Sequence, residues 1–183
     1  MTMSQEYLEI ITFWFKTIEP KSWWIKDTDF DNLLKNKFSD IHQSAVQGEL
    51  WHWRETALGR LAEIIVIDQF SRNMYRNTAK AFLYDPIALV LSQEAIRQQA
   101  NKQLQGKELS FLYMPFMHSE SLAIHHQAVK LFAEPGLEGN VNFEKRHFDI
   151  IERFARYPHR NEILNRQSTP EELEFLEQPG SSF

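Results

Sequence analysis

Apolar residues recur along almost the whole chain at intervals of three and four positions, which is the spacing of one face of a helix. The first such stretch runs from about Ser4 to about Ile18. A second begins near Asp29 and ends at Gly48, where a left-handed residue commonly follows a helix. A third covers roughly residues 57–73. No stretch sustains the alternation of a strand, so the pattern predicts helices alone.

Proline positions divide the middle of the chain. Asp85 and the proline that follows it are typical of a helix start, and this fourth helix is expected to reach about Leu104. The fifth apolar stretch covers residues 109–132 and contains Pro115. Because proline lacks the N–H that a helix interior needs, we expect a break there and a new start near Ser119.

The last third of the chain carries two more helix signals. A sixth helix is expected from about Asn142 to Tyr157, because Pro158 disfavours the helical conformation of the residue before it. Thr169 stands three positions before Glu172, with a proline between them, which is the pattern of a capping box. It predicts a short acidic helix near the end of the chain.

These elements predict an all-α protein of about six to eight helices. A length of 183 residues suits one domain over 1–183, with 158–183 as a C-terminal extension packed on the helices. Hydrophobic residues make up 43% and charged residues 25%, an ordinary globular balance that argues against disorder. Aromatic residues make up 13%, enough for a large core or an aromatic groove.

Charge and composition exclude several classes of function. A net charge of −5 disfavours nucleic acid and anionic membrane surfaces as partners. The chain has no cysteine, which excludes disulfides, thiolate catalysis and cysteine-based metal sites. The beginning of the chain lacks the pattern of a secretory signal, and no apolar run is long enough to span a bilayer. We therefore expect a cytoplasmic protein.

Two polar residues fall on apolar helix faces. Asp68 lies four residues after Ile64 on the inward face of the third helix, and Arg72 follows four residues later. A buried carboxylate needs a partner, so Asp68 is either half of a structural salt bridge or part of a binding or catalytic site. His147 likewise lies on the face defined by Phe143 and Ile151.

Two further polar segments follow in the second half. In His118-Ser119-Glu120, the last two residues fit a helix start, but that explanation leaves His118 unexplained. Residues 145–166 contain six Lys or Arg against three Asp or Glu. Arginine forks suit carboxylate or phosphate groups, and a histidine beside them could titrate. The same arginines could instead cap the sixth helix and hold the C-terminal extension.

Several well-known motifs are absent. The chain has no HExxH helix, nucleophile elbow, phosphate loop or dinucleotide-binding turn. A metal site of histidines and carboxylates is chemically possible, but the adjacent His125 and His126 would point about 100° apart on a helix. We therefore assign no metal and leave any cofactor unknown.

These polar clusters also carry a family resemblance. The segments are Trp24, Phe30-Asp31, Gly48-Glu49-Leu50, 68–73 (DQFSRN), 113–120 (YMPFMHSE) and 153–161 (RFARYPHRN), with the match continuing to the end of the chain. In this order and spacing they resemble the bacterial family catalogued as domain of unknown function 924, over roughly residues 10–183. The resemblance implies a tetratricopeptide-like helical fold and no established activity. Because no 34-residue repeat is recognisable, the fold would be a degenerate array of antiparallel helix pairs.

The resemblance also has local departures. The family usually has proline at Ser71, glycine at Ala155 and Asn165, and glutamine at His125. The first three lie at expected loops or helix ends and should be tolerated, and His125 is assigned no role.

The polar residues that the resemblance marks supply the candidate site. The catalytic candidates are Asp68, His118, Glu120 and His159, and the ligand-binding candidates are Gln69, Arg72, Asn73, Ser119, His147, Arg156, Arg160 and Asn161. We expect them to converge on a water-accessible pocket for a small anionic molecule. Arginines would hold the acidic group, and a histidine oriented by a carboxylate would make the protein a cofactor-free acid–base enzyme.

Two alternatives remain open. In the first, the chain is a scaffold or peptide-binding module with a protein partner, and an aromatic groove is lined by Trp14, Trp23, Trp24, Trp51 and Trp53. In the second, the polar residues only fasten the C-terminal extension to the helices.

Overall fold

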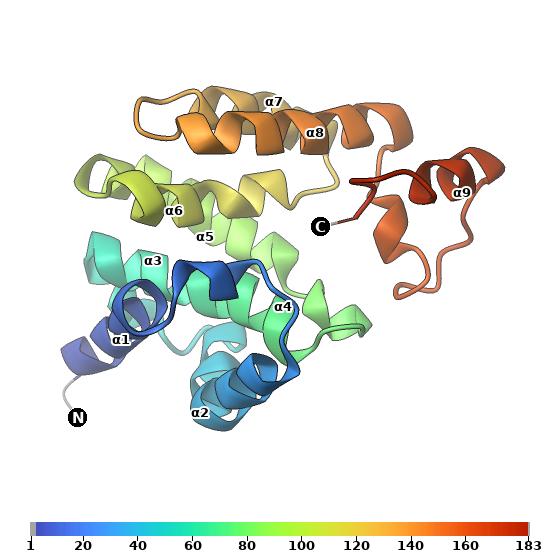
Figure 1. The fold of residues 1–183 in the computed structure, drawn as a ribbon. Coiled ribbons are helices and arrows are strands. Elements are labelled where there is room, and N and C mark those ends of the chain that lie inside the picture. Colours follow the sequence, from blue (N-terminus) through green and yellow to red (C-terminus); the bar gives the residue numbers. More distant parts are fainter. Residues whose placement is uncertain (1–2, 183) are drawn as a thin grey trace.

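The computed structural model describes residues 3–182, and its elements are helices and connecting segments (Figure 1). The α-helices are α1 (Met3–Thr12), α2 (Thr28–Val46), α3 (Ala57–Ile65), α4 (Ser71–Met74), α5 (Asp85–Arg97), α6 (Gly106–Met117), α7 (Leu122–Phe132), α8 (Glu138–Phe154) and α9 (Pro170–Leu176). Two π-helical turns are η1 (Phe13–Thr17) and η4 (Val66–Phe70). The 3₁₀ turns are η2 (Pro20–Trp23), η3 (Trp51–Glu55), η5 (Ala79–Ala81), η6 (Ala100–Gln103) and η7 (Pro158–Arg160).

The all-α prediction is confirmed. Because η4 joins α3 directly to α4, the described chain forms eight separate helices, within the predicted six to eight. Local capping explains where several of them begin and end. Asp27 caps α2 by accepting the amides of Asp29 and Phe30, and Gly48 follows α2 with a φ of +76°. The capping box between Thr169 and Glu172 is present at α9.

Several helix boundaries differ from the prediction. Pro115 lies inside α6, and the chain leaves the helix only after Met117 and resumes at Leu122. The residues of α6 around Pro115 are buried, so packing compensates for the one missing backbone hydrogen bond. Tyr84 occupies the N-cap position of α5 without a capping side-chain hydrogen bond, and Asp85, in the first turn, binds arginine.

The fourth helix, α5, ends at Arg97 and not at about Leu104, because Gln99 adopts the left-handed conformation. The sixth helix, α8, both starts and ends earlier than expected, at Glu138 and Phe154.

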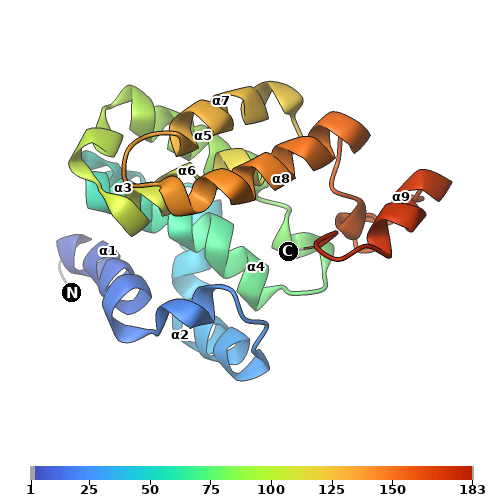
Figure 2. The same cartoon turned by 45° about the horizontal axis from the view of Figure 1, so that its top comes forward.

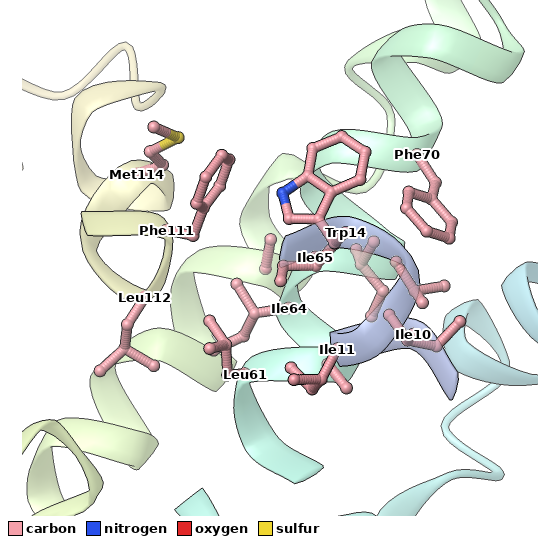
Figure 3. Close-up of a cluster of buried hydrophobic side chains, with 14 of the residues drawn as sticks. Ile10, Ile11, Trp14, Leu61, Ile64, Ile65, Phe70, Phe111, Leu112 and Met114 are labelled. Carbon is pink, nitrogen blue, oxygen red and sulfur yellow. The ribbon is translucent and has the colours of Figure 1, made fainter. Parts of the chain in front are cut away.

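The continuous helix α3–η4–α4 lies at the centre of the fold. It packs against α1 on one side and against α5 and α6 on the other, while α7 and α8 lie side by side beyond α6 (Figures 1 and 2). Leu61, Ile64 and Ile65 of α3 face Ile11 of α1 in the core (Figure 3). The helices on both sides therefore pack against this central helix.

The tryptophans divide between core and surface. Trp14 and Trp53 are 0% and 1% exposed and belong to the core, where Trp14 packs between Phe70 and Phe111 (Figure 3). A buried indole ring removes a large apolar area from water, which stabilises the folded state. A groove lined by all five tryptophans is therefore not formed.

Two of the departures from the family pattern have a backbone explanation. Ala155 follows α8 with a φ of +56°, and Asn165 has a φ of +53°. Glycine adopts this left-handed region without strain, which explains why a glycine suits both positions. In the described chain, no helix is long and apolar enough to cross a membrane.

Gly59 is the position where packing demands glycine. A Cβ added there would lie 1.9 Å from the backbone oxygen of Trp53. We predict that Gly59→Ala lowers the free energy of unfolding by about 1–3 kcal/mol, because backbone must shift to relieve the overlap. Urea unfolding measures the loss. Gly139→Ala in α8 is the control, since nothing lies within 4 Å of its added Cβ. Equal stability of the two variants would contradict the prediction.

Candidate functional site

The candidate site is built on the π-helical turn η4, which carries Asp68 and Gln69 in the middle of the central helix. A π turn widens the helix locally and redirects the side chains on it, and such turns are frequent at functional sites. The sequence predicted an uninterrupted helix here and gave no sign of the turn. Asp68 is only 1% exposed, so its charge depends on its neighbours.

Three side chains hold the Asp68 carboxylate. His118 contacts its Oδ1 through Nδ1 at 2.8 Å, Gln69 donates to its Oδ2 at 2.5 Å, and Arg72 lies 3.1 Å from Oδ1. Burial by itself would raise the pKa of Asp68, but the charge of Arg72 and the hydrogen bonds from His118 and Gln69 outweigh it. The pKa of Asp68 therefore lies well below its ordinary value, and the carboxylate is ionised at neutral pH.

An ionised Asp68 decides the protonation of His118. Burial and the charge of Arg72 lower the pKa of His118 against the opposing effect of Asp68, so the ring is neutral at neutral pH. A neutral imidazole has one N–H, and the ionised carboxylate can only accept. Nδ1 therefore carries the proton and Nε2 is unprotonated. The side chain keeps 17% of its surface exposed.

Asp85 links the arginines of the site. Its two carboxylate oxygens each accept a hydrogen bond from Arg72 at 2.9 Å, and Oδ2 also accepts from Arg160 at 3.2 Å. Arg160 donates to the backbone oxygen of His118 at 3.1 Å and lies between the rings of Phe82 and Tyr157, 4.4 and 4.5 Å from their centroids. Sequence reasoning missed Asp85, because an Asp before a proline is typical of a helix start.

Two more candidate histidines lie beside Tyr157, which also contacts the buried His125. The rings of His147 and His159 lie 5.7 and 5.6 Å from the Tyr157 ring, whose hydroxyl donates to the backbone oxygen of Met117 at 2.5 Å. Burial lowers the pKa of His147 to about 3, and burial with the charge of Arg160 lowers that of His159 to about 3. Both rings are therefore neutral at physiological pH.

The other carboxylate candidate, Glu120, has a different partner. It accepts two hydrogen bonds from Arg166, at 2.6 and 2.9 Å, and one from the Tyr157 amide at 2.8 Å. Burial would raise the pKa of Glu120, but Arg166 and this amide hold it below its ordinary value. Glu120 thus fastens the C-terminal segment to the end of α6 and does not contact His118. Arg166 was missing from the candidate set.

Two candidates belong to a network at α9. Arg156 makes a bidentate pair with Glu172 at 2.6 and 2.7 Å, and Asn161 contacts the same carboxylate at 3.3 Å. Arg166 donates to Asn161 at 3.0 Å and so joins this network to Glu120. These contacts hold α9 and the loop before it, and they leave no direct link from Arg156 to His118.

The remaining candidates make local contacts. Asn73 donates to the backbone oxygen of Gln69 at 3.0 Å and accepts from Arg76 at 2.8 Å. Ser119 accepts the amide of Ser121 at 3.2 Å between α6 and α7. The structure therefore brings together Asp68, Gln69, Arg72, His118, His147, His159 and Arg160, and it places the other candidates in neighbouring structural contacts.

Two surface hollows lie away from this cluster. One of about 400 Å³ is lined by Leu8, Glu9, Thr12, Phe13, Thr17 and Lys37. The other, of about 280 Å³, is lined by Gln93, Ile96, Phe116, Gln127, Lys130 and Leu131. Neither is lined by a candidate residue. Among the described residues, no group of three or more His, Asp or Glu is arranged to hold a metal ion.

The buried histidines predict how stability depends on pH. The unfolded chain binds protons at His147 and His159 as the pH falls through about 6.5, whereas the native state resists protonation until about pH 3. Stability is therefore highest above pH 6.5 and falls as the pH is lowered, by up to about 1.4 kcal/mol per pH unit for each histidine. Urea unfolding at pH 7.5, 6 and 5 measures the slope.

Substitutions test whether His147 and His159 cause this dependence of stability on pH. His147→Gln and His159→Gln should each flatten the pH dependence, and His126→Gln should leave it unchanged because His126 is exposed. An identical slope in all three variants would contradict the assignment.

Comparison with known proteins places this geometry in a family. The model of a family described as bacterial protein of unknown function, domain of unknown function 924, matches residues 10–180. The solved structure of the protein of unknown function ATU0120 from Agrobacterium tumefaciens is similar, with 38% identity and a TM-score of 0.92 over 97% of this chain and 99% of that chain. No curated protein matches. The chain therefore belongs to the bacterial family of domain of unknown function 924.

Proposed function

We propose that this protein is a cofactor-free acid–base enzyme that binds a small anionic molecule beside His118. In this proposal His118 is the catalytic base and Asp68 is a positioning residue that fixes its tautomer. The observation that carries the proposal is the hydrogen bond of 2.8 Å between His118 Nδ1 and a fully buried, ionised carboxylate. It leaves Nε2 as a proton acceptor on a partly exposed ring.

The proposed step is a proton transfer. Nε2 takes a proton from a bound substrate or from a water molecule that attacks it, and the imidazolium then returns the proton to the leaving group. The low pKa of His118 in the free protein keeps the ring available as a base. Asp68 stabilises the imidazolium once it forms, as an orienting carboxylate does in other acid–base sites.

The charges near His118 support an anionic ligand. Arg72 and Arg160 face two carboxylates, Asp68 and Asp85, so these four charges cancel while His118 is neutral. The buried Nε of Arg160 has no hydrogen-bond partner among residues 3–182. When His118 accepts a proton, the positive charge of the cluster rises by one. A ligand that carries or develops negative charge would then be paired with the protein.

Asp68→Asn tests the tautomer. The amide of asparagine can donate to Nδ1, which would move the proton of His118 to Nε2. Diethyl pyrocarbonate acylates unprotonated imidazole nitrogens, so we predict that labelling of His118 slows at least about tenfold, as followed by peptide mass spectrometry. The exposed His126 is the internal reference. Asp149→Asn, which removes one exposed carboxylate, is the control for the change in net charge.

Diethyl pyrocarbonate labelling of His118 also detects the binding of an anion beside it. Inorganic phosphate or acetate bound beside Nε2 should slow the labelling of His118 and leave that of His126 unchanged. The acid–base proposal fails if Asp68→Asn labels His118 as fast as the unaltered protein does. The anion-binding part fails if neither anion slows that labelling at millimolar concentration.

A further inference from the structure

A second fully buried acid lies between α7 and α8, which pack side by side beyond α6 (Figure 1). Glu144 of α8 is 1% exposed, and its Oε1 lies 2.8 Å from Nδ1 of His125 of α7, which is 0% exposed. The other carboxyl oxygen, Oε2, is buried and has no hydrogen-bond partner among residues 3–182. An ionised carboxylate with one oxygen left unsatisfied in the interior is costly, so this site favours the uncharged acid.

The second ring nitrogen of His125 shows where its proton lies. Nε2 is 2.8 Å from the backbone oxygen of Ser119, which can only accept a hydrogen bond. Nε2 is also 3.2 Å from the hydroxyl oxygen of Tyr157, whose own proton is donated to the backbone oxygen of Met117. Both neighbours of Nε2 are therefore acceptors, and Nε2 carries a proton. Because a neutral imidazole has one N–H, its Nδ1 accepts, and the proton of that hydrogen bond belongs to Glu144.

The surroundings of the pair favour a protonated Glu144 over an ion pair with a charged imidazolium. Burial raises the pKa of Glu144 against the opposing effect of His125. The other titratable groups near the pair are Tyr157 and His147, and both are uncharged because burial raises the pKa of the tyrosine and lowers that of the histidine. Arg160 lies over the Tyr157 ring and makes its ion pair with a different carboxylate. Within the described chain, Glu144 has no ion-pair partner besides His125.

The proton on Nε2 of His125 matters for the end of α6. The last carbonyl groups of a helix have no hydrogen-bond partner within it. Here Tyr157 binds the carbonyl before His118 at 2.5 Å, and His125 binds the carbonyl after it at 2.8 Å. Arg160 binds the carbonyl of His118 itself at 3.1 Å. The backbone that carries His118 is thus held by three side chains from outside the helix.

Loss of the Glu144 proton would reverse two of these three contacts. An ionised carboxylate can only accept, so the proton of His125 would move to Nδ1 to keep the hydrogen bond between the pair. Nε2 would then face the carbonyl oxygen of Ser119 with no proton between them. The Tyr157 hydroxyl would turn to donate to Nε2 and would release its present acceptor. The carbonyls on both sides of His118 would each lose a hydrogen bond.

We propose that Glu144 and His125 form a proton-dependent latch that holds the end of α6 and so positions His118. The latch is closed while Glu144 carries its proton, and it opens when that proton is released to solvent as the pH rises. Both residues of the latch are positioning residues, since neither contacts the His118 ring. The inference goes beyond the proposed function, because it concerns where His118 lies and does not depend on its action as a base.

Nitrogen-15 NMR of the histidine rings tests where the proton lies. At pH 7 we expect a neutral His125 with its proton on Nε2, and His125→Gln assigns this signal by its absence. Raising the pH to 10 should move the proton to Nδ1 and shift the backbone amide signals of His118 and Ser119. Glu144→Gln still donates to Nδ1 through its amide but cannot titrate, so it should show neither change.

Stability measurements give a second test of the latch. The native state keeps the Glu144 proton at pH values where the unfolded chain has lost it, so this contribution is full below about pH 4.5 and is lost as the pH rises through the raised native pKa. Glu144→Gln lacks this loss. Relative to the unaltered protein, its unfolding equilibrium constant should fall by up to about tenfold per pH unit over this range, as measured by urea unfolding. The dependence due to His147 and His159 is common to both proteins and cancels.

Glu152→Gln is the matched control, because it removes an exposed carboxylate from the same helix. It should behave as the unaltered protein does in both experiments. The inference is overturned if His125 at pH 7 is an imidazolium or carries its only proton on Nδ1, if its tautomer is unchanged up to pH 10, or if Glu144→Gln titrates as the unaltered protein does. None of these results alters the labelling of Asp68→Asn, which tests the proposed base separately.

Discussion

The burial of one ionised carboxylate organises this structure. Asp68 lies in the central helix with 1% of its surface exposed, where an unpaired charge would cost several kcal/mol. Its partners come from its own helix and from the end of α6, and Arg72 among them requires Asp85 at the start of α5. Asp85 in turn binds Arg160 from the C-terminal segment. The need to keep one charge paired therefore connects four separate parts of the chain.

This constraint divides the polar residues into two groups. Around Asp68, the contacts fix a neutral His118 whose Nε2 is unprotonated, and His147 and His159 remain neutral beside it. Around Glu120, bidentate arginine pairs attach the C-terminal segment and α9. The twelve candidate residues thus divide into a smaller cluster around Asp68 and a neighbouring network that holds the C-terminal segment. The idea that the polar residues fasten the C-terminal extension holds for that second group.

Helix positions were predictable because their signals are local. A cap or a capping box depends on residues two to four positions apart, and these signals correctly placed α2 and α9. The same local logic failed at Asp85 and Pro115, where contacts from distant segments decided the outcome. The resemblance to the family is confirmed over residues 10–180, whereas its tetratricopeptide-like part stays a prediction.

The sequence by itself determined the helical class, most helix boundaries and the fact that Asp68 and His147 lie on apolar faces. Only the tertiary structure decided which acid meets which base. His118 and Asp68 are 50 positions apart, and Arg160 and Asp85 are 75 apart. Such groups meet only after the chain has packed. No local sequence pattern predicts the π turn that carries Asp68 or the stacking of Trp24 on Phe111. Helix formation is set by neighbours one turn away, whereas the chemistry depends on contacts that packing alone creates.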